Sequence, residues 1–469
     1  MDKKKQLIED ILKSTEKNDE AAELCAQAEK LYDEKKYKEA VKIWREAADK
    51  NSAEALYMLG ICHNYYLGVE DDIKKEECGA AASKYFIRAA ELGHPEAQCF
   101  AALCYNSGIG VEEDEEKMLF WFRKSAEQNC VEAMNNLAYF AANGVGVKSE
   151  ETKEEESFAW YKKSAELGNA AGQLGVGKAY YKGRGVKRNE AEAVKWYTLS
   201  AEQGLPEALF CLGICYDFGR GVPQNATQAF ELYKKAAVLN HAKAQCYVGY
   251  AYEKGEGVSR NIPEAVAWYE RSAANNYFQA FCNLGCLYEQ GIGVKRDIKK
   301  AIEMYEKAGE LGCAMAICNI AKVYEFGKGG VRTDLKLAIE YYKKAAELGD
   351  EEAQFNLGQL YYKGMGVQKD DKTAAYWFLQ AAENGDADAQ CKIGTFYMQG
   401  IGVDEDEEEA FKWIKRAALQ NDADSQYLLG VCYEEGLGVK PDLTESRDWY
   451  ERAALQGNKS AKKALKHLK

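Results

Sequence analysis

The chain repeats itself about every 36 residues, and this period restricts its possible folds more than any other feature. The string Gly-x-Gly-Val begins at Gly108, Gly144, Gly183, Gly219, Gly255, Gly291, Gly364, Gly400 and Gly436. A variant begins at Gly327 with one extra residue before Val331, and a degenerate copy, Tyr66-Leu67-Gly68-Val69, lies upstream. Seven of the ten intervals between successive first positions are 36 residues. Eleven such repeats predict one continuous array in which each repeat packs on its neighbours.

Each repeat is predicted to contain two helices. In the first helix, apolar residues recur at offsets 0, 4 and 8, as at Ala280, Leu284 and Tyr288, and mark one helical face. A glycine at offset 5 lets a neighbouring helix approach closely. The Gly-x-Gly-Val string ends the first helix, because glycine adopts the left-handed conformation that closes a helix C-terminus. After a polar stretch, the second helix ends in an aromatic pair before Ala-Ala, as at Trp268-Tyr269.

The composition follows from these landmarks. Glycine occurs 41 times and proline only 5 times, so the turns are glycine turns. Tyrosine occurs 31 times against 16 phenylalanines. Ten of the eleven repeats keep an aromatic residue at the second place of the pair, and we expect these rings to form one packing column.

In these landmarks the chain resembles the Sel1-like repeat family, relatives of the tetratricopeptide repeats whose helix pairs stack into a right-handed superhelix. The resemblance covers residues 53–457. Residues 21–50 resemble a tetratricopeptide unit instead, through Leu31, Tyr37, Ala40, Trp44 and Ala47. We therefore expect an all-α solenoid in three parts: a tetratricopeptide-like helical cap over residues 1–52, eleven Sel1-like repeats over residues 53–457, and a capping helix over residues 458–469.

Several classes of function are disfavoured by composition. The net charge is −13, from 62 basic and 75 acidic residues, which argues against a nucleic-acid partner. No apolar run reaches the ~18 residues of a membrane span, and the basic start of the chain has no apolar stretch behind it, so neither a span nor a secretory signal is expected.

The sequence also gives little support for an enzymatic function. The Gly-rich turns follow helices and recur in every repeat, so we interpret them as turns and not as phosphate loops. The four histidines, His63, His94, His241 and His467, are scattered, and no Cys-x₂-Cys spacing exists. We expect no catalytic residues, no metal, no cofactor and no small-molecule substrate. We expect His94 and His241, at repeat boundaries, either to cap helices or to be solvated.

The 15 cysteines include five at offset 2 of first helices: Cys99, Cys246, Cys282, Cys318 and Cys391. Secreted relatives in the Sel1-like family can join each second helix to the following first helix by a disulfide. This chain has Ala-Ala where the first such cysteine would stand, as at Ala236-Ala237. Because the total is odd and no paired spacing is evident, we expect reduced thiols and a cytoplasmic protein.

A binding surface is expected on the first helices, where offsets 2, 6, 9 and 10 should face a groove. Offset 9 places a carboxylate in four consecutive repeats: Asp217, Glu253, Glu289 and Glu325. Aromatic groups predicted beside this column are Phe210, Phe218, Phe326, Phe355, Tyr181, Tyr250 and Tyr362. Such a stripe would suit an extended or helical protein segment carrying Lys or Arg. The alternative is a solvated face, since Glu and Lys are common on exposed helices.

The resemblance implies a non-enzymatic scaffold or adaptor that holds protein partners. The alternative is a regulatory or accessory subunit of an enzyme complex, or a bacterial effector acting on host proteins.

Overall fold

The computed structural model describes residues 19–71 and 73–468, and within these ranges every regular element is a helix. Contacts divide the chain into two compact units, Met1–Ala236 and Ala237–Lys469, which are taken in turn. The predicted all-α class is confirmed.

In the described part of the first unit, residues 19–33 are helical. The following helices are α2 (Tyr37–Asp49), α3 (Ala53–Asn64), the 3₁₀ turn η1 (Lys75–Glu77), α4 (Cys78–Glu91), α5 (Pro95–Ser107), α6 (Glu115–Glu127), α7 (Val131–Ala142), α8 (Lys153–Glu166), α9 (Ala170–Lys182), α10 (Glu190–Glu202), α11 (Pro206–Phe218) and α12 (Ala226–Val238), whose last residues belong to the second unit.

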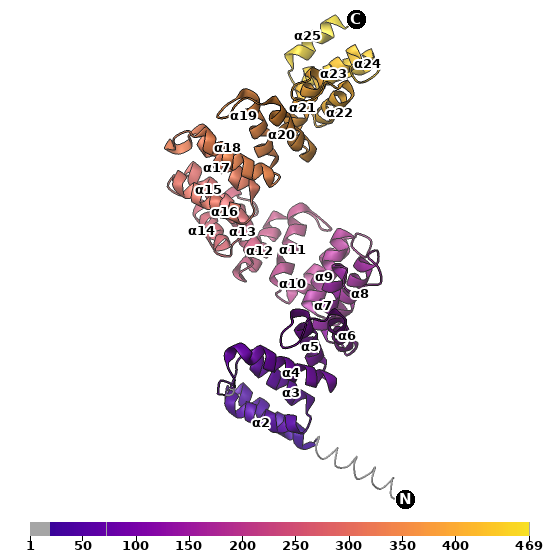
Figure 1. Ribbon diagram of the computed structural model, residues 1–469, viewed down its shortest axis with the longest axis vertical. Coiled ribbons are helices and arrows are strands. Elements are labelled where there is room, and N and C mark those ends of the chain that lie inside the picture. The colour runs from indigo at the N-terminus through magenta and orange to yellow at the C-terminus, as the bar shows by residue number, and fades with distance from the viewer. Residues whose placement is uncertain (1–18, 72, 469) are drawn as a thin grey trace, which may run out of the picture. The chain divides into compact units, whose positions relative to one another are not determined.

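The second unit continues in the same alternation (Figure 1). Its elements are α13 (Ala242–Lys254), α14 (Ile262–Ala274), α15 (Phe278–Gln290), α16 (Ile298–Glu310), α17 (Ala314–Phe326), the 3₁₀ turn η2 (Lys328–Gly330), α18 (Leu335–Glu347), α19 (Glu351–Lys363), α20 (Asp371–Asn384), α21 (Ala387–Gln399), α22 (Glu407–Leu419), α23 (Ala423–Glu435), α24 (Leu443–Leu455) and α25 (Lys459–His467).

Within each unit, a helix packs mainly on the helices directly before and after it in the chain. First helices also touch the next first helix, as α7 does α9 and α17 does α19. The repeats thus stack as predicted, and the core is one series of small clusters shared between neighbours.

The second-place aromatic ring of each pair lies over the glycine of the first helix in the same repeat. A Cβ added to Gly285 would come within 2.5 Å of the Tyr305 ring, and Gly358 is covered in the same way by Phe378. Tyr305 and Phe378 are fully buried. The predicted packing column and the predicted close helix approach are both confirmed.

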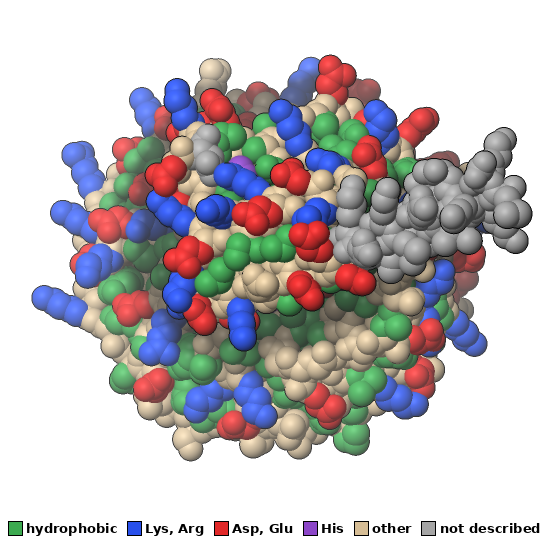
Figure 2. Space-filling model, turned by 90° about the horizontal axis from the view of Figure 1, so that it is seen from below, with side chains coloured by type: hydrophobic (Ala, Val, Ile, Leu, Met, Phe, Trp, Pro, Cys, Tyr) green, Lys and Arg blue, Asp and Glu red, His purple; other side chains and the backbone are tan. Residues whose placement is uncertain are grey.

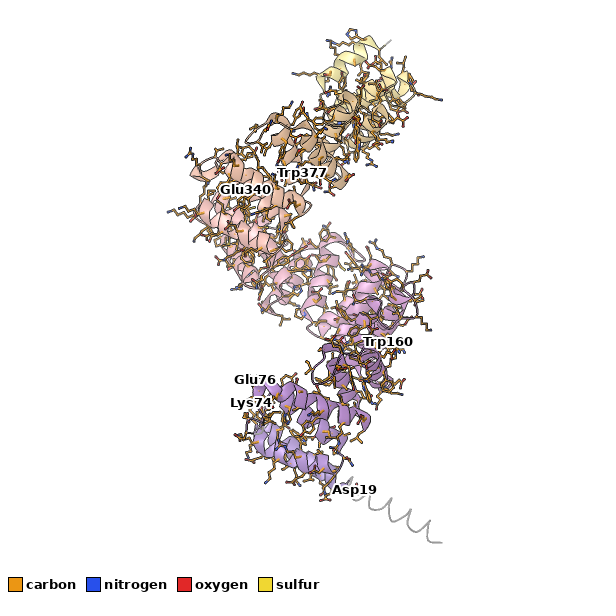
Figure 3. The ribbon with its side chains drawn as sticks, in the orientation of Figure 1. Asp19, Lys74, Glu76, Trp160, Glu340 and Trp377 are labelled. Carbon is orange, nitrogen blue, oxygen red and sulfur yellow. The ribbon has the colours of Figure 1, made fainter. Side chains whose placement is uncertain are left out.

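The first-place aromatic residue packs on the preceding repeat, a contact that the sequence pattern did not reveal. Trp160 on α8 packs against the cluster built around Phe122 of the preceding repeat, and Trp377 on α20 packs against the cluster around Tyr342 (Figure 3). Each aromatic pair therefore joins its own repeat through one ring and the preceding repeat through the other.

The glycine turns have the predicted backbone conformation. Gly291 ends α15 with φ of 74°, in the left-handed region, and Gly293 follows with φ of 70°. A Cβ on Gly293 would lie 2.1 Å from Cγ2 of Ile262, so the turn is tight as well as left-handed.

The ends of the array also pack on their neighbours. Trp44 on α2 is buried in one cluster with Leu56 and Leu59 of α3. At the other end, Ala461 of α25 is buried beside Tyr450 and Ala453 of α24. The terminal helices thus cover an apolar face of the repeats next to them.

Candidate partner-binding surface on the first helices

The predicted carboxylates lie in the last turn of their first helices. Glu253, Glu289 and Glu325 belong to α13, α15 and α17 of the second unit, and Asp217 belongs to α11 of the first. All four are half-buried. The column is therefore less open than a solvated helix face would be.

Each of these carboxylates accepts a hydrogen bond from the buried tyrosine of its own repeat. Tyr269 Oη donates to Glu253 Oε2 at 2.9 Å, and Tyr305 Oη donates to Glu289 Oε2 at 2.9 Å. The same contact recurs between Tyr233 and Asp217 (3.0 Å), Tyr342 and Glu325 (2.5 Å), and Tyr450 and Glu434 (2.7 Å). The carboxylates therefore tie the end of each first helix to the second helix.

Burial and these carboxylates raise the pKa values of the tyrosines. Burial, with Glu253 beside the ring, raises the pKa of Tyr269 well above its ordinary value. Burial and the hydrogen bond to Glu325 raise the pKa of Tyr342 in the same direction. Both phenols stay protonated and act as donors.

Two of the carboxylates also have a cationic neighbour. Glu253 Oε1 lies 2.6 Å from Lys254 Nζ, and Glu289 Oε1 lies 2.7 Å from Lys328 Nζ. The carboxylate side chains are only 19% and 17% exposed, whereas the lysines are 47% and 37% exposed. A competing cation from a partner would have to displace an exposed lysine, which costs little.

The predicted aromatic residues divide into two groups. Phe218 and Phe326 are 58% and 65% exposed, and Tyr250 is 42% exposed, so these three offer open apolar surface. The other four are half-buried: Phe210 packs on Tyr233, Phe355 on Phe378, Tyr181 on Tyr197 and Arg220, and Tyr362 on Phe396. The inward projection of offset 2 overestimated exposure, because that position lies between repeats.

A cavity of about 560 Å³ opens between α13 and α15 in the second unit. Tyr250, Glu253 and Lys254 line it from α13, and Asn283 and Gln290 line it from α15. Arg260, Cys286, Leu287 and Ile292 complete the lining. The structure thus brings two of the predicted residues, Tyr250 and Glu253, together in one concave site with amide and cationic groups.

A second cavity, of about 640 Å³, lies between α14, α15 and α16. Its charged lining residues are Lys300, Lys307, Glu303, Glu310 and Glu270. None of the predicted site residues lines it. All of its charged lining residues belong to the second helices α14 and α16.

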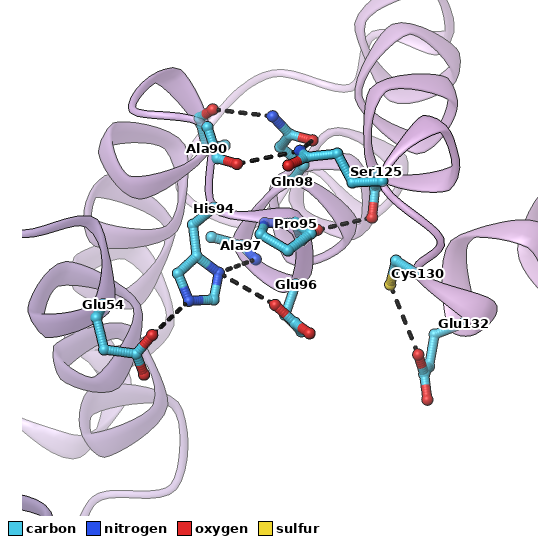
Figure 4. A network of polar contacts seen from close by, with 12 residues as sticks. Glu54, Ala90, His94, Pro95, Glu96, Ala97, Gln98, Ser125, Cys130 and Glu132 are labelled. Carbon is cyan, nitrogen blue, oxygen red and sulfur yellow. Dashed lines mark hydrogen bonds and ion pairs between the residues drawn. The ribbon is translucent and has the colours of Figure 1, made fainter.

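Polar bridges between repeats are a further feature that sequence reasoning missed. Gln128 at the end of α6 donates to Gln98 Oε1 of α5 at 2.9 Å, and Gln98 donates to Ala90 O of the helix before it (Figure 4). Donation to the glutamine oxygen recurs at Gln173, Gln245, Gln354, Gln390 and Gln426. The last four also donate to a backbone carbonyl, as Gln98 does. The sequence signal for these bridges was a polar residue at offset 1, where the start of the first helix is otherwise apolar. Buried amides that bridge two repeats in this way fix the register in which the repeats stack.

The two boundary histidines cap helices, the first of the two roles predicted for them. His94 Nδ1 accepts the backbone N–H of Ala97, and His241 Nδ1 accepts that of Ala244. His94 also contacts Glu54 of the preceding repeat at 3.0 Å (Figure 4). These contacts give both rings a structural role at a helix N-terminus.

Residues 19–71 and 73–468 contain no group of three or more His, Cys, Asp or Glu side chains that could hold a metal ion. No helix in that described part is long and apolar enough to cross a membrane. On the face seen in Figure 2, side chains of both charges are interspersed without a patch of one sign.

Comparison with known proteins identifies the repeat. The family described as Sel1 repeat matches eleven segments: residues 53–94, 95–130, 131–169, 170–205, 206–241, 242–277, 280–313, 314–350, 351–386, 387–422 and 423–458. No curated protein matches the chain.

Two solved structures are similar in both fold and sequence. A protective antigen of uropathogenic Escherichia coli with the SLR fold is 31% identical, with a TM-score of 0.59, and the match covers 91% of this chain and 90% of that one. A Sel1 repeat protein from Oxalobacter formigenes is 30% identical, with a TM-score of 0.54, and the match covers 66% of this chain and 89% of that one. Repeat, stacking and sequence agree, and the chain belongs to the Sel1 repeat family.

Proposed function

We propose that the protein is a non-enzymatic scaffold that holds a segment of a partner protein against its first helices, with the cavity between α13 and α15 as a main contact. The observation that carries this proposal is the cavity itself, because it joins an exposed aromatic ring, a carboxylate and two amides from consecutive repeats. A fold of this family presents such surfaces for protein recognition, and no catalytic family matches the chain.

The partner segment is proposed to be extended and to carry a basic side chain. A Lys or Arg entering the cavity would replace Lys254 at Glu253, exchanging one exposed ion pair for another with better burial. The Asn283 and Gln290 amides can both donate to and accept from a peptide backbone, and Tyr250 supplies an apolar wall. Phe326 extends the second unit's surface, and Asp217 and Phe218 supply similar groups in the first unit.

The half-buried aromatic residues support this surface from below. Phe355 and Tyr362 hold α19 and α21 in position, and Phe210 and Tyr181 do so in the first unit. Glu289 and Glu325 are proposed to serve mainly as ties to Tyr305 and Tyr342, with a secondary part in attracting a basic segment.

Two further assignments accompany the proposal. Residues 1–52 and 458–469 are proposed to act as caps, supported by the packing of Trp44 and Ala461 on adjacent repeats. A reducing, cytoplasmic environment is proposed because all fifteen cysteines are free thiols.

Peptide selection tests the binding proposal directly. A displayed library of random extended peptides is selected on the purified protein, and the enriched peptides are expected to contain Lys or Arg. Tyr250→Ala and Glu253→Gln should each weaken binding of an enriched peptide by about tenfold or more. Gln keeps a hydrogen-bond acceptor for Tyr269, whereas reversal to Lys would set an ammonium group against Lys254 and destabilise the helix pair.

The control is Tyr376→Ala, which removes a ring that is 54% exposed on the second helix α20. It should leave peptide binding unchanged. Binding that survives both cavity substitutions but is lost in the Tyr376 variant would place the surface on the second helices and contradict the proposal.

A further inference from the structure

One contact recurs at several boundaries between repeats. The residue at offset 2 of a first helix meets the residue that caps the next first helix. Tyr57 stacks on His94 with ring centroids 4.4 Å apart, and Asn135 Nδ2 donates to Asn169 Oδ1 at 3.0 Å. At these boundaries the backbone therefore holds the two positions within side-chain contact distance.

At two boundaries both positions are cysteines. Cys282 Sγ lies 3.2 Å from Cys313 Sγ, and the two side chains are 1% and 7% exposed. Cys99 and Cys130 form the equivalent hydrogen-bonded pair in the first unit. Figure 4 shows Cys130 at the start of α7, with its sulfur directed toward Glu132 at 3.6 Å.

Helix capping does not explain these cysteines. Neither Cys130 nor Cys313 makes a side-chain cap hydrogen bond as a neutral thiol, and only the ionised sulfur is stabilised by the backbone N–H of Ala133 or Ala316. Side chains that do cap at the equivalent place are His94, Asn169, His241, Asp350, Asp386, Asp422 and Asn458. Such a cap is missing before four first helices, at Cys130, Leu205, Tyr277 and Cys313, and only at the two cysteines is the facing offset-2 residue also a cysteine.

The surroundings also distinguish the two partners of each pair. The hydrogen bond from Cys99 lowers the pKa of Cys130 to about 7, and the bond from Cys282 lowers the pKa of Cys313 likewise. The partner thiolate and burial raise the pKa values of Cys99 and Cys282. This asymmetry favours Cys130 and Cys313 as the attacking sulfurs.

We propose that Cys99–Cys130 and Cys282–Cys313 are oxidation sites, at which a peroxide converts each thiol pair into a disulfide that joins two consecutive repeats. The capping thiolate attacks the peroxide, the O–O bond breaks, and a sulfenic acid and one water form. The partner thiol then attacks the sulfenic sulfur, the S–S bond forms, and the second water leaves. Two sulfurs lose two electrons together, and the peroxide is reduced to two waters.

This pairing differs from the register of the secreted Sel1-like relatives. Here the bond would connect consecutive first helices at their packed ends and leave the second helices out. The two disulfides would fix two boundaries between repeats, one in each unit. Their formation would not require the partner-binding surface to change.

The test uses the full chain and hydrogen peroxide. Reduced protein is treated with a modest excess of peroxide, remaining thiols are alkylated, and the products are digested without reductant for mass spectrometry. The expected result is a fall of four in the number of alkylated cysteines, with Cys99 linked to Cys130 and Cys282 linked to Cys313. Dithiothreitol should restore all fifteen thiols.

The chain supplies its own controls. Cys246, Cys318 and Cys391 occupy the same offset but face Tyr277, Asp350 and Asp422, so they should stay alkylatable. Cys130→Ser and Cys313→Ser restore a capping hydroxyl, and each should reduce the loss of thiols from four to two. The oxidised wild type should melt several degrees higher than the reduced protein, and the double Ser variant should show no such rise.

Three outcomes would overturn the proposal. One is full alkylation of Cys99, Cys130, Cys282 and Cys313 after peroxide treatment of folded protein. Another is disulfides that link other cysteines or separate chains. The third is unchanged thiol loss in the Cys130→Ser and Cys313→Ser variants.

Discussion

The repeat of α15 and α16 and the repeat of α19 and α20 share one backbone design but differ at two linked positions. In the first, the buried ring is Tyr305, and the first helix ends in Glu289, which accepts the phenol's hydrogen bond. In the second, the buried ring is Phe378, and the equivalent residue is Tyr362, which packs on Phe396. Both rings cover a glycine of the first helix.

Across the chain, a carboxylate at this position occurs only in repeats with a tyrosine at the second aromatic place, although the repeats of Tyr161 and Tyr197 have Ala142 and Tyr181 there. The repeats whose buried residue is Phe86, Phe122, Phe378 or Ile414 end their first helices in Asn64, Asn106, Tyr362 and Met398. All five carboxylates at this position, Asp217, Glu253, Glu289, Glu325 and Glu434, belong to repeats with a buried tyrosine that donates to them. The comparison teaches that the acidic column is first of all a partner for buried hydroxyls, and only then a charged surface.

The largest expected difference between tyrosine repeats and phenylalanine repeats is their loss of stability at alkaline pH. Burial, with the facing carboxylate, raises the pKa values of Tyr269, Tyr342 and Tyr450 above the ordinary ~10. Stability from these groups is therefore complete below about pH 10 and is lost as pH rises toward the folded-state pKa values. We expect cooperative loss of helicity above pH 11, together with the rise in absorbance of ionised tyrosine at 295 nm. Reversible ionisation of all 31 tyrosines near pH 10 with helicity intact would contradict this.

Deleting a buried ring should damage both kinds of repeat equally. Tyr305→Ala and Phe378→Ala each remove a fully buried ring that covers a glycine, and each should lower the free energy of unfolding by about 3–5 kcal/mol. Urea unfolding gives the total change, and hydrogen exchange locates it to the helices of that repeat. A loss at Phe378 much smaller than at Tyr305 would mean that the ring column is not the shared element.

Adding a hydroxyl to the phenylalanine repeat should expose the difference. Phe378→Tyr buries a phenol near the Phe355 and Phe396 rings, with no carboxylate at the end of α19, and should cost about 1–3 kcal/mol. Introducing Tyr362→Glu in the same chain should recover part of this loss, because it rebuilds the pair found at Tyr305 and Glu289. A double variant no more stable than Phe378→Tyr alone would show that the pairing depends on more than these two positions.

The sequence predicted the period, the helix pairs, the glycine turns and the ring column, because each repeats in phase and depends on local backbone or packing rules. It did not predict that the ring column and the acidic column are hydrogen-bonded to each other. The two positions are 16 residues apart, as in Glu289 and Tyr305, and no helical period relates them. A comparison between repeats would have revealed the link, since carboxylates are confined to tyrosine repeats.

The exposure of offset 2 and the cysteine pairs were missed for a related reason. A single-helix projection treats offset 2 as open, but the next repeat covers it, so Cys282 is buried against Cys313. Their separation of 31 residues falls short of the 36-residue period and gave no signal of pairing. Contacts between repeats depend on how the repeats stack, which helical periodicity alone does not contain.

A double-mutant cycle at Tyr342 and Glu325 tests the central claim most directly, because their 2.5 Å hydrogen bond has no lysine ion pair beside it in the described contacts. The variants are Tyr342→Phe, Glu325→Ala and their combination, with Tyr161→Phe as control in a repeat whose first helix ends in Ala142. The predicted coupling free energy from urea unfolding is at least about 1 kcal/mol, and the control should lose less than Tyr342→Phe does. If the two single-variant losses of unfolding free energy add to within about 0.3 kcal/mol of the double-variant loss, the claim is wrong and the acidic column is only a solvated surface.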